Sequence, residues 1–434
     1  MAVTPIVAII GRPNVGKSSL FNRLVGQRQA ITHESAGTTR DANYGLVSWS
    51  GQHAMFVDTA GLHKSQDNLE LQAIEQITAV ADIASVLVIV VDAGTMLTTE
   101  DQEVVKLARK SGKPVILALN KIDTAHGKPM DEFEKLGLKE SVETSAIHGR
   151  GTGDLLDLVF KHSGSSEEPE SSDGITIAIV GRPNVGKSSL MNSMLGKQQA
   201  IVSDVAGTTR DVNSGAIKYH GINIHLLDTA GLRRRGKIEA GIEKYSALRT
   251  LAAITRSDIA VVVMDCTELG VAGDQHIAGQ VIEAGKGMIL VANKWDAIEK
   301  ETGTQERYTR RIQREFAFAP WAPLVYTSAT QGLNVTKLFE LVTEIHQRRS
   351  TKIPTGELNR LIEDLTSKQP PAGLKGKQPK VKYATQTDTS PPTFGVHTSY
   401  ADLVHFSYQR YLENGIRDKY DFTGTPIKLE FKGK

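Results

Sequence analysis

The chain has 434 residues, which is too long for one ordinary hydrophobic core and suggests three domains of roughly 150 residues each. With 51 basic and 49 acidic residues, the overall charge of +2 gives no reason to expect nucleic-acid binding. The single cysteine, Cys266, excludes a disulfide within the chain. The apolar run ASVLVIVV is shorter than the ~18 residues of a membrane span, and no signal peptide precedes it, so we expect a cytoplasmic protein without a membrane partner.

The sequence GRPNVGKSSL occurs twice, and each copy lies between an apolar run typical of a strand and a helical pattern. Both copies fit the phosphate-binding pattern G-x-x-x-x-G-K-[ST], in which backbone N–H groups and the lysine bind phosphates and the hydroxyl binds magnesium. The helix N-terminus that follows favours an anion. We therefore expect phosphate to bind at two loops, Gly11, Arg12, Pro13, Asn14, Val15, Gly16, Lys17 and Ser18 in the first and Gly181, Arg182, Pro183, Asn184, Val185, Gly186, Lys187 and Ser188 in the second.

The two loops belong to a duplicated domain. Residues 6–41 and 176–211 share 23 identities in 36 positions, and AGTTRD recurs in both. In each copy, apolar strand-like runs alternate with amphipathic helical stretches, which predicts an α/β fold with a mostly parallel sheet and helices on both faces. The glycines Gly26 and Gly196 are expected to end the helix that follows each loop.

A D-x-x-G motif follows an apolar strand in each copy, as expected of a switch that senses the γ-phosphate. Its aspartate would reach magnesium through water. The threonine pairs 38–39 and 208–209 lie where a nucleotide-ordered switch belongs, and one threonine of each pair completes the magnesium shell; the sequence does not say which, and Thr39 and Thr209 are our candidates. The motif residues are Asp58, Thr59, Ala60, Gly61 and Leu62, and Asp228, Thr229, Ala230, Gly231 and Leu232.

An N-K-x-D tetrad ends a later strand in each copy and predicts the base. An aspartate at the purine edge accepts hydrogen bonds from guanine N1–H and N2–H₂, and adenine lacks both donors in that arrangement. This disfavours an ATPase or nucleotide kinase that uses the same loop. The tetrads are Asn120, Lys121, Ile122 and Asp123, and Asn293, Lys294, Trp295 and Asp296, with further backbone contacts to the base expected from Ser145, Ala146, Ser328 and Ala329.

The domain boundaries follow from composition. An acidic, Ser-rich stretch at 163–174 is interpreted as a flexible linker between domains at 1–162 and 175–349. A small α+β domain follows at 350–434, with 13 of the basic and 9 of the acidic residues. Its elements are predicted as a helix at 356–367, strands at 381–386 and 393–398, a helix at 402–420 and a strand at 427–431. The apolar stripe of that long helix is Val404, Tyr408, Leu412, Ile416 and Tyr420.

These motifs, together with the C-terminal segments VKYATQ, PPTFGV and HFSYQRYLENGIRDKY, resemble the bacterial double-GTPase family Der, also called EngA. The resemblance covers essentially the whole chain. It implies GTP hydrolysis in two G domains, a KH-like third domain, and a role in assembling the large ribosomal subunit, in which nucleotide state controls domain arrangement and ribosomal RNA binding. The partners implied are that subunit and its RNA, with no DNA, and we expect a monomer.

Many GTPases place a glutamine after D-x-x-G, where it orients the attacking water. Here Leu62 and Leu232 occupy that position and cannot do so, and catalysis therefore needs another group. In GTPases that this chain resembles, an asparagine at the position of Asn14 and Asn184 helps hold potassium near the phosphates. We therefore expect potassium to assist Lys17 and Lys187, the alternative being that asparagine merely suits a turn.

Two basic segments leave alternatives open. Arg233, Arg234, Arg235 and Lys237 follow the second D-x-x-G and form either a nucleotide-dependent contact surface or a solvated loop. In the third domain, a stretch without acidic residues could follow a phosphate backbone, and its Gly373–Gly376 string is interpreted as an ordinary loop; the lysines are Lys368, Lys375, Lys377, Lys380 and Lys382, near Tyr383 and Phe394. An alternative function is a ribosome-binding scaffold in which one G domain is a structural or regulatory module.

Overall fold

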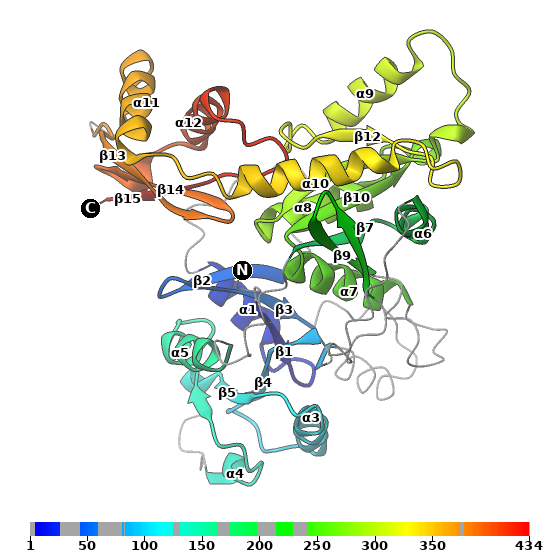
Figure 1. Cartoon of the computed structure of the whole chain (residues 1–434). Coiled ribbons are helices and arrows are strands. Elements are labelled where there is room, and N and C mark those ends of the chain that lie inside the picture. Colours follow the sequence, from blue (N-terminus) through cyan, green and yellow to red (C-terminus); the bar gives the residue numbers. More distant parts are fainter. Residues whose placement is uncertain are drawn as a thin grey trace. The chain divides into compact units, whose positions relative to one another are not determined.

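The computed structural model describes residues 5–26, 44–59, 80–81, 83–124, 131–163, 174–197, 214–228, 242–373 and 377–433. The chain divides into two compact units. One contains most of the first repeat together with residues 237–255, and the other contains the rest of the second repeat and the C-terminal domain. Figure 1 shows the helices and strands of the chain, coloured along the sequence from blue at the N-terminus to red at the C-terminus. None of the helices in these ranges has the length and apolar composition needed to span a bilayer.

The first repeat is a six-stranded sheet in the order β2-β3-β1-β4-β5-β6. Strand β2 runs antiparallel to β3, and the other neighbouring strands are parallel. Figure 1 shows α3 and α5 on opposite sides of the sheet. The elements are β1 (Ile6–Ile10), α1 (Lys17–Gly26), β2 (Tyr44–Trp49), β3 (Gln52–Asp58), β4 (Val86–Asp92), α3 (Thr99–Lys110), β5 (Val115–Asn120), the 3-10 turn η3 (Ile122–Thr124), α4 (Asp131–Glu134), β6 (Ser141–Glu143) and α5 (Thr152–Ser163).

The second repeat has the same topology, with the order β8-β9-β7-β10-β11-β12. Helices α6, α8 and α10 contact its strands, and α10 runs along the sheet (Figure 1, yellow). The elements are β7 (Ile175–Val180), α6 (Lys187–Lys197), β8 (Ser214–Tyr219), β9 (Ile222–Asp228), α7 (Ile242–Arg256), β10 (Ile259–Asp265), η5 (Cys266–Glu268), α8 (Ala272–Glu283), β11 (Gly287–Asn293), η6 (Trp295–Ala297), α9 (Thr304–Glu315), β12 (Leu324–Tyr326) and α10 (Val335–Arg349). The predicted α/β fold is confirmed for both repeats.

Buried apolar strands explain why both sheets form. Every residue of β4 and β10 is buried, as expected for central parallel strands that helices cover on both faces. Cys266 follows β10 with 2% of its surface exposed, and burial, with the nearby Asp265 and Asp296, raises the pKa of its thiol to about 12. This cysteine is therefore a small buried side chain at a strand end.

The predicted helix end is confirmed at Gly26, which is the last residue of α1, whereas α6 extends one residue beyond Gly196, to Lys197. Neither glycine has the positive φ that a left-handed helix cap requires. Of the predicted linker, only Ser163, which ends α5, and Gly174, which precedes β7, belong to the described residues.

The C-terminal domain is a three-stranded sheet, in the order β13-β14-β15, with two main helices. Strands β13 and β14 are antiparallel, and β15 is parallel to β14. Helix α11 packs on β13 and on α12. The elements are α11 (Thr355–Lys368), β13 (Val381–Thr389), β14 (Pro392–Thr398), η7 (Ala401–Leu403), α12 (Phe406–Lys419) and β15 (Lys428–Lys432).

The predicted helix at 402–420 is too long. A 3-10 turn occupies its start, and α12 begins at Phe406 because the His405 ring accepts a hydrogen bond from the amide of Ser407 and caps the helix there. Val404 and Tyr420 therefore flank the helix. The stripe still faces the core, since Val404, Tyr408, Leu412 and Ile416 are buried in one cluster and Tyr420 packs against it.

The C-terminal domain and the second repeat share a junction at Gly424. Its amide donates to the carbonyl of Trp321 (2.8 Å), and its own carbonyl accepts from the amide of Met288 at the start of β11 (2.9 Å). The guanidinium of Arg417 lies 5.3 Å from the centre of the Trp321 ring. Gly424 has φ +77°, and a Cβ there would lie 2.4 Å from the Ile345 side chain, so this position requires glycine.

Gly424→Ala should lower the melting temperature of the full chain more than Gly221→Ala does. Both substitutions place a side chain at positive φ, at a cost of about 1 kcal/mol, but Gly221 has no atom within 4 Å of the added Cβ. The overlap with Ile345 should add about 1–3 kcal/mol at Gly424. Thermal unfolding of the two variants measures the difference, and equal melting temperatures would contradict the assigned packing.

Candidate nucleotide sites

Each phosphate loop joins the end of a buried strand to the first turn of a helix. In the first repeat the loop leaves β1, and α1 begins at Lys17. The Lys17 ammonium is held in the loop, where it donates to the carbonyls of Gly11 (2.8 Å) and Arg12 (2.7 Å). Lys187 makes the same bonds to Gly181 (2.9 Å) and Arg182 (2.6 Å). Both loops thus bring an ammonium group to the helix N-terminus, where phosphate would bind.

Burial changes the acidity of Lys17. Only 4% of the residue is exposed, and this burial lowers the pKa of Lys17 to about 8, although Asp58 raises it. Asp58 is itself buried at the end of β3, next to Ile9 of β1. A phosphate would raise the pKa of Lys17 again, because an anion stabilises the ammonium form.

The asparagine of each tetrad binds the phosphate loop. Asn120 donates through Nδ2 to the carbonyl of Val15 (3.0 Å), and Asn293 does the same to Val185 (2.9 Å). A Cβ on Gly16 would lie 2.4 Å from Asn120 Nδ2, so glycine is needed there for the two segments to meet. Gly186 is in the same position, 2.3 Å from Asn293 Nδ2.

A Ser-Ala pair, Ser145-Ala146 in the first repeat and Ser328-Ala329 in the second, binds the asparagine of each tetrad through the alanine amide. The amide of Ala146 donates to Asn120 Oδ1 (3.0 Å), and the amide of Ala329 donates to Asn293 Oδ1 (3.1 Å). The structure therefore brings loop, tetrad and Ser-Ala pair together. The predicted contacts of Ser145, Ala146, Ser328 and Ala329 with the base stay predictions.

The base-recognition aspartates remain accessible. Asp123 is partly exposed, with His148 Nε2 4.0 Å away, and Asp296 is exposed. A hydrogen bond from Ser328 holds the pKa of Asp296 below its ordinary value, with help from Thr330. Ionised carboxylates of this kind can accept the two N–H bonds of guanine.

The side chains of Arg12 and Arg182 point to a helix rather than into the loop. Arg12 Nε lies 3.2 Å from Asp101 in the first turn of α3, and Arg182 Nε lies 3.0 Å from Asp274 in the first turn of α8. The carboxylate side chains are only 3% and 4% exposed. Because an unpaired buried charge is costly, these pairs anchor the loop backbone to the helix. No sequence pattern pointed to the two aspartates.

The two D-x-x-G motifs are described only in part. In the first motif Thr59 is described, and its hydroxyl donates to the carbonyl of Ile9 (2.9 Å). Asp228 is placed at the end of β9, but its side chain is not described. The predicted residues outside the described ranges are Thr38, Thr39, Thr208, Thr209, Ala60, Gly61, Leu62, Thr229, Ala230, Gly231, Leu232, Arg233, Arg234, Arg235, Lys237, Lys375 and Gly376.

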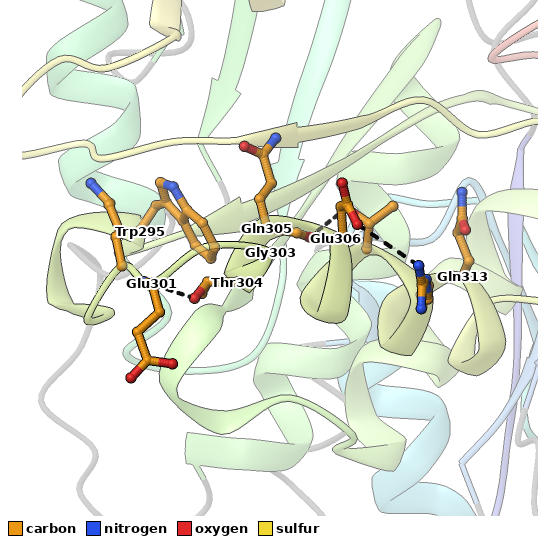
Figure 2. A pocket seen from close by; sticks show the side chains of 10 residues that line it. Trp295, Glu301, Gly303, Thr304, Gln305, Glu306 and Gln313 are labelled. Carbon is orange, nitrogen blue, oxygen red and sulfur yellow. Dashed lines mark hydrogen bonds and ion pairs between the residues drawn. The ribbon is translucent and has the colours of Figure 1, made fainter.

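A separate open pocket lies beside the second tetrad (Figure 2). Trp295 lines one end, and Thr304, Gln305 and Glu306 of α9 lie farther along it. No residue of the loop 181–188 lines it, so this pocket is not the phosphate site. Trp295 as a whole is 6% exposed, and its ring packs against the Tyr326 ring with 4.4 Å between the centres, so this tetrad residue is largely buried although it borders the pocket.

Two further carboxylates, Asp92 and Asp265, touch the tetrads but are absent from the predicted set. Asp92 ends β4 and accepts from Lys121 Nζ (2.7 Å), and Asp265 ends β10 with Lys294 Nζ at 2.5 Å. The available signal was positional, because each aspartate ends the apolar strand before the tetrad strand.

Two family models match this chain. A family model described as a 50S ribosome-binding GTPase matches residues 6–121 and 176–294. A second, described as the KH-domain-like C-terminal part of EngA bacterial GTPase enzymes, matches residues 352–432. The two models together reach from the first strand of the first repeat to the last strand of the C-terminal domain.

Curated relatives are similar over nearly the whole chain. GTPase Der of Herpetosiphon aurantiacus is 46% identical over 440 residues, covering 99% of this chain and 97% of the relative. GTPase Der of Chloroflexus aggregans is 46% identical over 442 residues, covering 99% and 98%. GTPase Der of Caldicellulosiruptor saccharolyticus is 45% identical over 435 residues, covering 99% of each chain.

GDP binding at the first site should weaken at alkaline pH. The free site binds best when Lys17 is protonated, so affinity is full below its pKa of about 8 and falls as pH rises above it. In a chain whose second site is disabled by Lys187→Ala, the dissociation constant should rise about tenfold from pH 7 to pH 9. Lys17→Arg is the control, because a guanidinium stays charged over this pH range. Deprotonation of the guanine base affects the chain that keeps Lys17 and the Lys17→Arg control equally, so it cancels in the comparison. Equal pH profiles would contradict the assignment.

Proposed function

Because the chain belongs to the Der (EngA) family of GTPases, which hydrolyse GTP, we propose that the nucleotide state of its two G domains controls their arrangement and their binding to ribosomal RNA during assembly of the large ribosomal subunit. The match to a 50S ribosome-binding GTPase model supports this partner. The proposed domains are 1–162, 175–349 and 350–434, joined by the linker 163–174, in a monomeric, cytoplasmic protein.

One observation carries the nucleotide part of this proposal. In both repeats, a loop that holds an ammonium group is tied by an asparagine to the segment that bears the base-recognition aspartate. A site that joins an anion-binding loop to a purine-binding carboxylate suits guanosine di- and triphosphates. Its presence in both repeats supports turnover at two sites rather than one structural module.

Magnesium fits the residues at the helix starts. Ser18 and Ser188 are exposed in the first turns of α1 and α6, and Asp58 lies beside Lys17. In each repeat, the serine hydroxyl would hold one magnesium ion against the nucleotide phosphates, and the aspartate, Asp58 or Asp228, would reach that ion through water. Thr39 and Thr209 would complete the two magnesium shells. The ion would neutralise charge on the β- and γ-phosphates.

Potassium fits the asparagines of the two loops. Asn14 and Asn184 both have φ +65°, a conformation that by itself favours asparagine at a turn. Both residues are also exposed at the loop surface, so the amide oxygen of each would hold one potassium ion, whose positive charge would counter negative charge developing on the phosphates. The Asn14 backbone is also fixed, because its carbonyl accepts from Lys121 Nζ (2.8 Å).

The C-terminal domain offers an RNA-binding face of lysines and an aromatic stack. Lys377, Lys380 and Lys382 are exposed. Tyr383 is 45% exposed and stacks on His397, with ring centres 4.2 Å apart and 14° between the planes. Bases stack on such rings while lysines bind phosphates. Phe394, by contrast, is fully buried and belongs to the core.

Binding of the protein to large ribosomal subunits should depend on nucleotide and on this face. We expect co-sedimentation to differ between GDP and a non-hydrolysable GTP analogue, and Lys380→Glu with Lys382→Glu to weaken it about tenfold or more at low salt. The matched control is Lys106→Glu with Lys337→Glu, two exposed lysines on α3 and α10. Indifference to nucleotide would contradict the switch, and equal loss in both double variants would contradict the RNA face.

GTP turnover should be faster in potassium than in sodium at equal ionic strength. Asn14→Ala with Asn184→Ala should remove most of the difference, because both amide oxygens are lost. The control is Asn22→Ala with Asn192→Ala, exposed positions on α1 and α6. Steady-state phosphate release measures the rates, and equal rates of the unaltered chain in the two salts would refute the potassium site.

A further inference from the structure

A carboxylate at the end of β4 connects the base tetrad of the first repeat to its phosphate loop. Asp92 stands opposite Asn120 in the parallel pair β4–β5. Its Oδ1 accepts from the amide of Gly94 (2.8 Å), and its Oδ2 accepts from Lys121 Nζ (2.7 Å). The same ammonium donates to the carbonyl of Asn14 (2.8 Å), so Lys121 bridges the strand end and the loop.

The second repeat builds the same carboxylate site from different neighbours. Asp265 stands opposite Asn293 in the pair β10–β11, and its Oδ2 lies 2.5 Å from Lys294 Nζ. Its Oδ1 accepts from both the amide (2.9 Å) and the hydroxyl (2.7 Å) of Thr267. Burial raises the pKa of Asp265, but the hydrogen bonds from Lys294 and Thr267 outweigh it and hold the pKa below its ordinary value.

The backbone of both tetrad lysines is strained, so their surroundings, which include the aspartates, hold them in place. Lys121 has φ +64° and Lys294 has φ +60°, a left-handed conformation that costs a residue with a Cβ about 1 kcal/mol or more. Such a conformation persists where the surroundings over-determine it. The carboxylates are 11% and 6% exposed, so each ion pair is shielded from solvent on the aspartate side.

We propose that Asp92 and Asp265 are positioning residues for guanine-nucleotide binding. Each holds the lysine of its N-K-x-D tetrad, and in the first repeat the lysine in turn holds the carbonyl of Asn14. In the first repeat, the base-binding and phosphate-binding segments are thereby kept at one separation before nucleotide arrives, which lowers the ordering needed on binding; in the second repeat, Asp265 keeps the tetrad lysine in place. This inference rests on the proposed guanine-nucleotide sites and concerns residues outside their motifs.

A double-mutant cycle at the first site tests the inference. The background is the full chain with Asp296→Asn, since an amide at the second site favours xanthine, which has a carbonyl where guanine has its amino group. GDP then reports the first site. Asp92→Asn should weaken GDP binding about tenfold, the value of one charge-assisted hydrogen bond. Asp154→Asn, on the exposed face of α5, is the control and should change affinity less than about twofold.

The decisive comparison adds Lys121→Ala. If Asp92 acts through Lys121, the double variant Asp92→Asn with Lys121→Ala binds GDP no worse than Lys121→Ala alone. Losses that multiply would overturn the inference and leave the guanine site intact. Failure of the background chain to bind GDP would instead overturn the proposed function. The melting temperature of the nucleotide-free chain is measured in parallel, and a fall there with unchanged GDP affinity would also overturn the inference.

The same cycle applies to the second site, with Asp123→Asn as the background and Asp265→Asn with Lys294→Ala as the pair. Non-additive losses there are expected from the shared geometry, although Asp265 takes its other hydrogen bonds from Thr267 and not from a glycine amide. Independent losses at this site would restrict the positioning role to Asp92.

Discussion

The structure depends on one close approach, between the second glycine of each phosphate loop and the asparagine of the base tetrad. A side chain at Gly16 or Gly186 would overlap the amide of Asn120 or Asn293, and with a glycine there the amide reaches the loop backbone. Parallel strands make this approach possible, since their carboxyl ends meet at one edge of the sheet. Phosphate and base recognition therefore form one connected framework in each repeat.

Ion pairs to carboxylates that are largely shielded from solvent hold that framework in place from two sides. On one side Arg12 is bound to Asp101 at the start of α3, and on the other Lys121 is bound to Asp92 at the end of β4. Removing one partner of such a pair leaves an uncompensated charge, so these contacts constrain geometry more than they add stability. Lys17 and Lys187, by contrast, keep their ammonium groups on loop carbonyls that a phosphate oxygen can replace.

Much of the fold was predictable because strand and helix patterns repeat at the expected periods. The C-terminal strands and α11 lie within three residues of their predicted bounds. The start of α12 was predicted wrongly, because a histidine ring caps the helix and apolar spacing carries no sign of that bond. Which aromatic side chains of the C-terminal strands are buried was also not predicted from the sequence. Phe394 and His397 lie on the same strand, β14, but the pleat of the strand places Phe394 in the core and His397 against Tyr383.

By itself, the sequence determined the duplicated α/β architecture, the two phosphate loops and the guanine tetrads, because those properties depend on local spacing and residue type. Tertiary structure decided what those residues touch. The Asn120 side chain binds the loop, Arg12 turns away from it, and Asp92 joins the site from a neighbouring strand. These contacts join residues about 30 to more than 100 positions apart, as in the pairs 92–121 and 15–120, and such contacts are set by strand register.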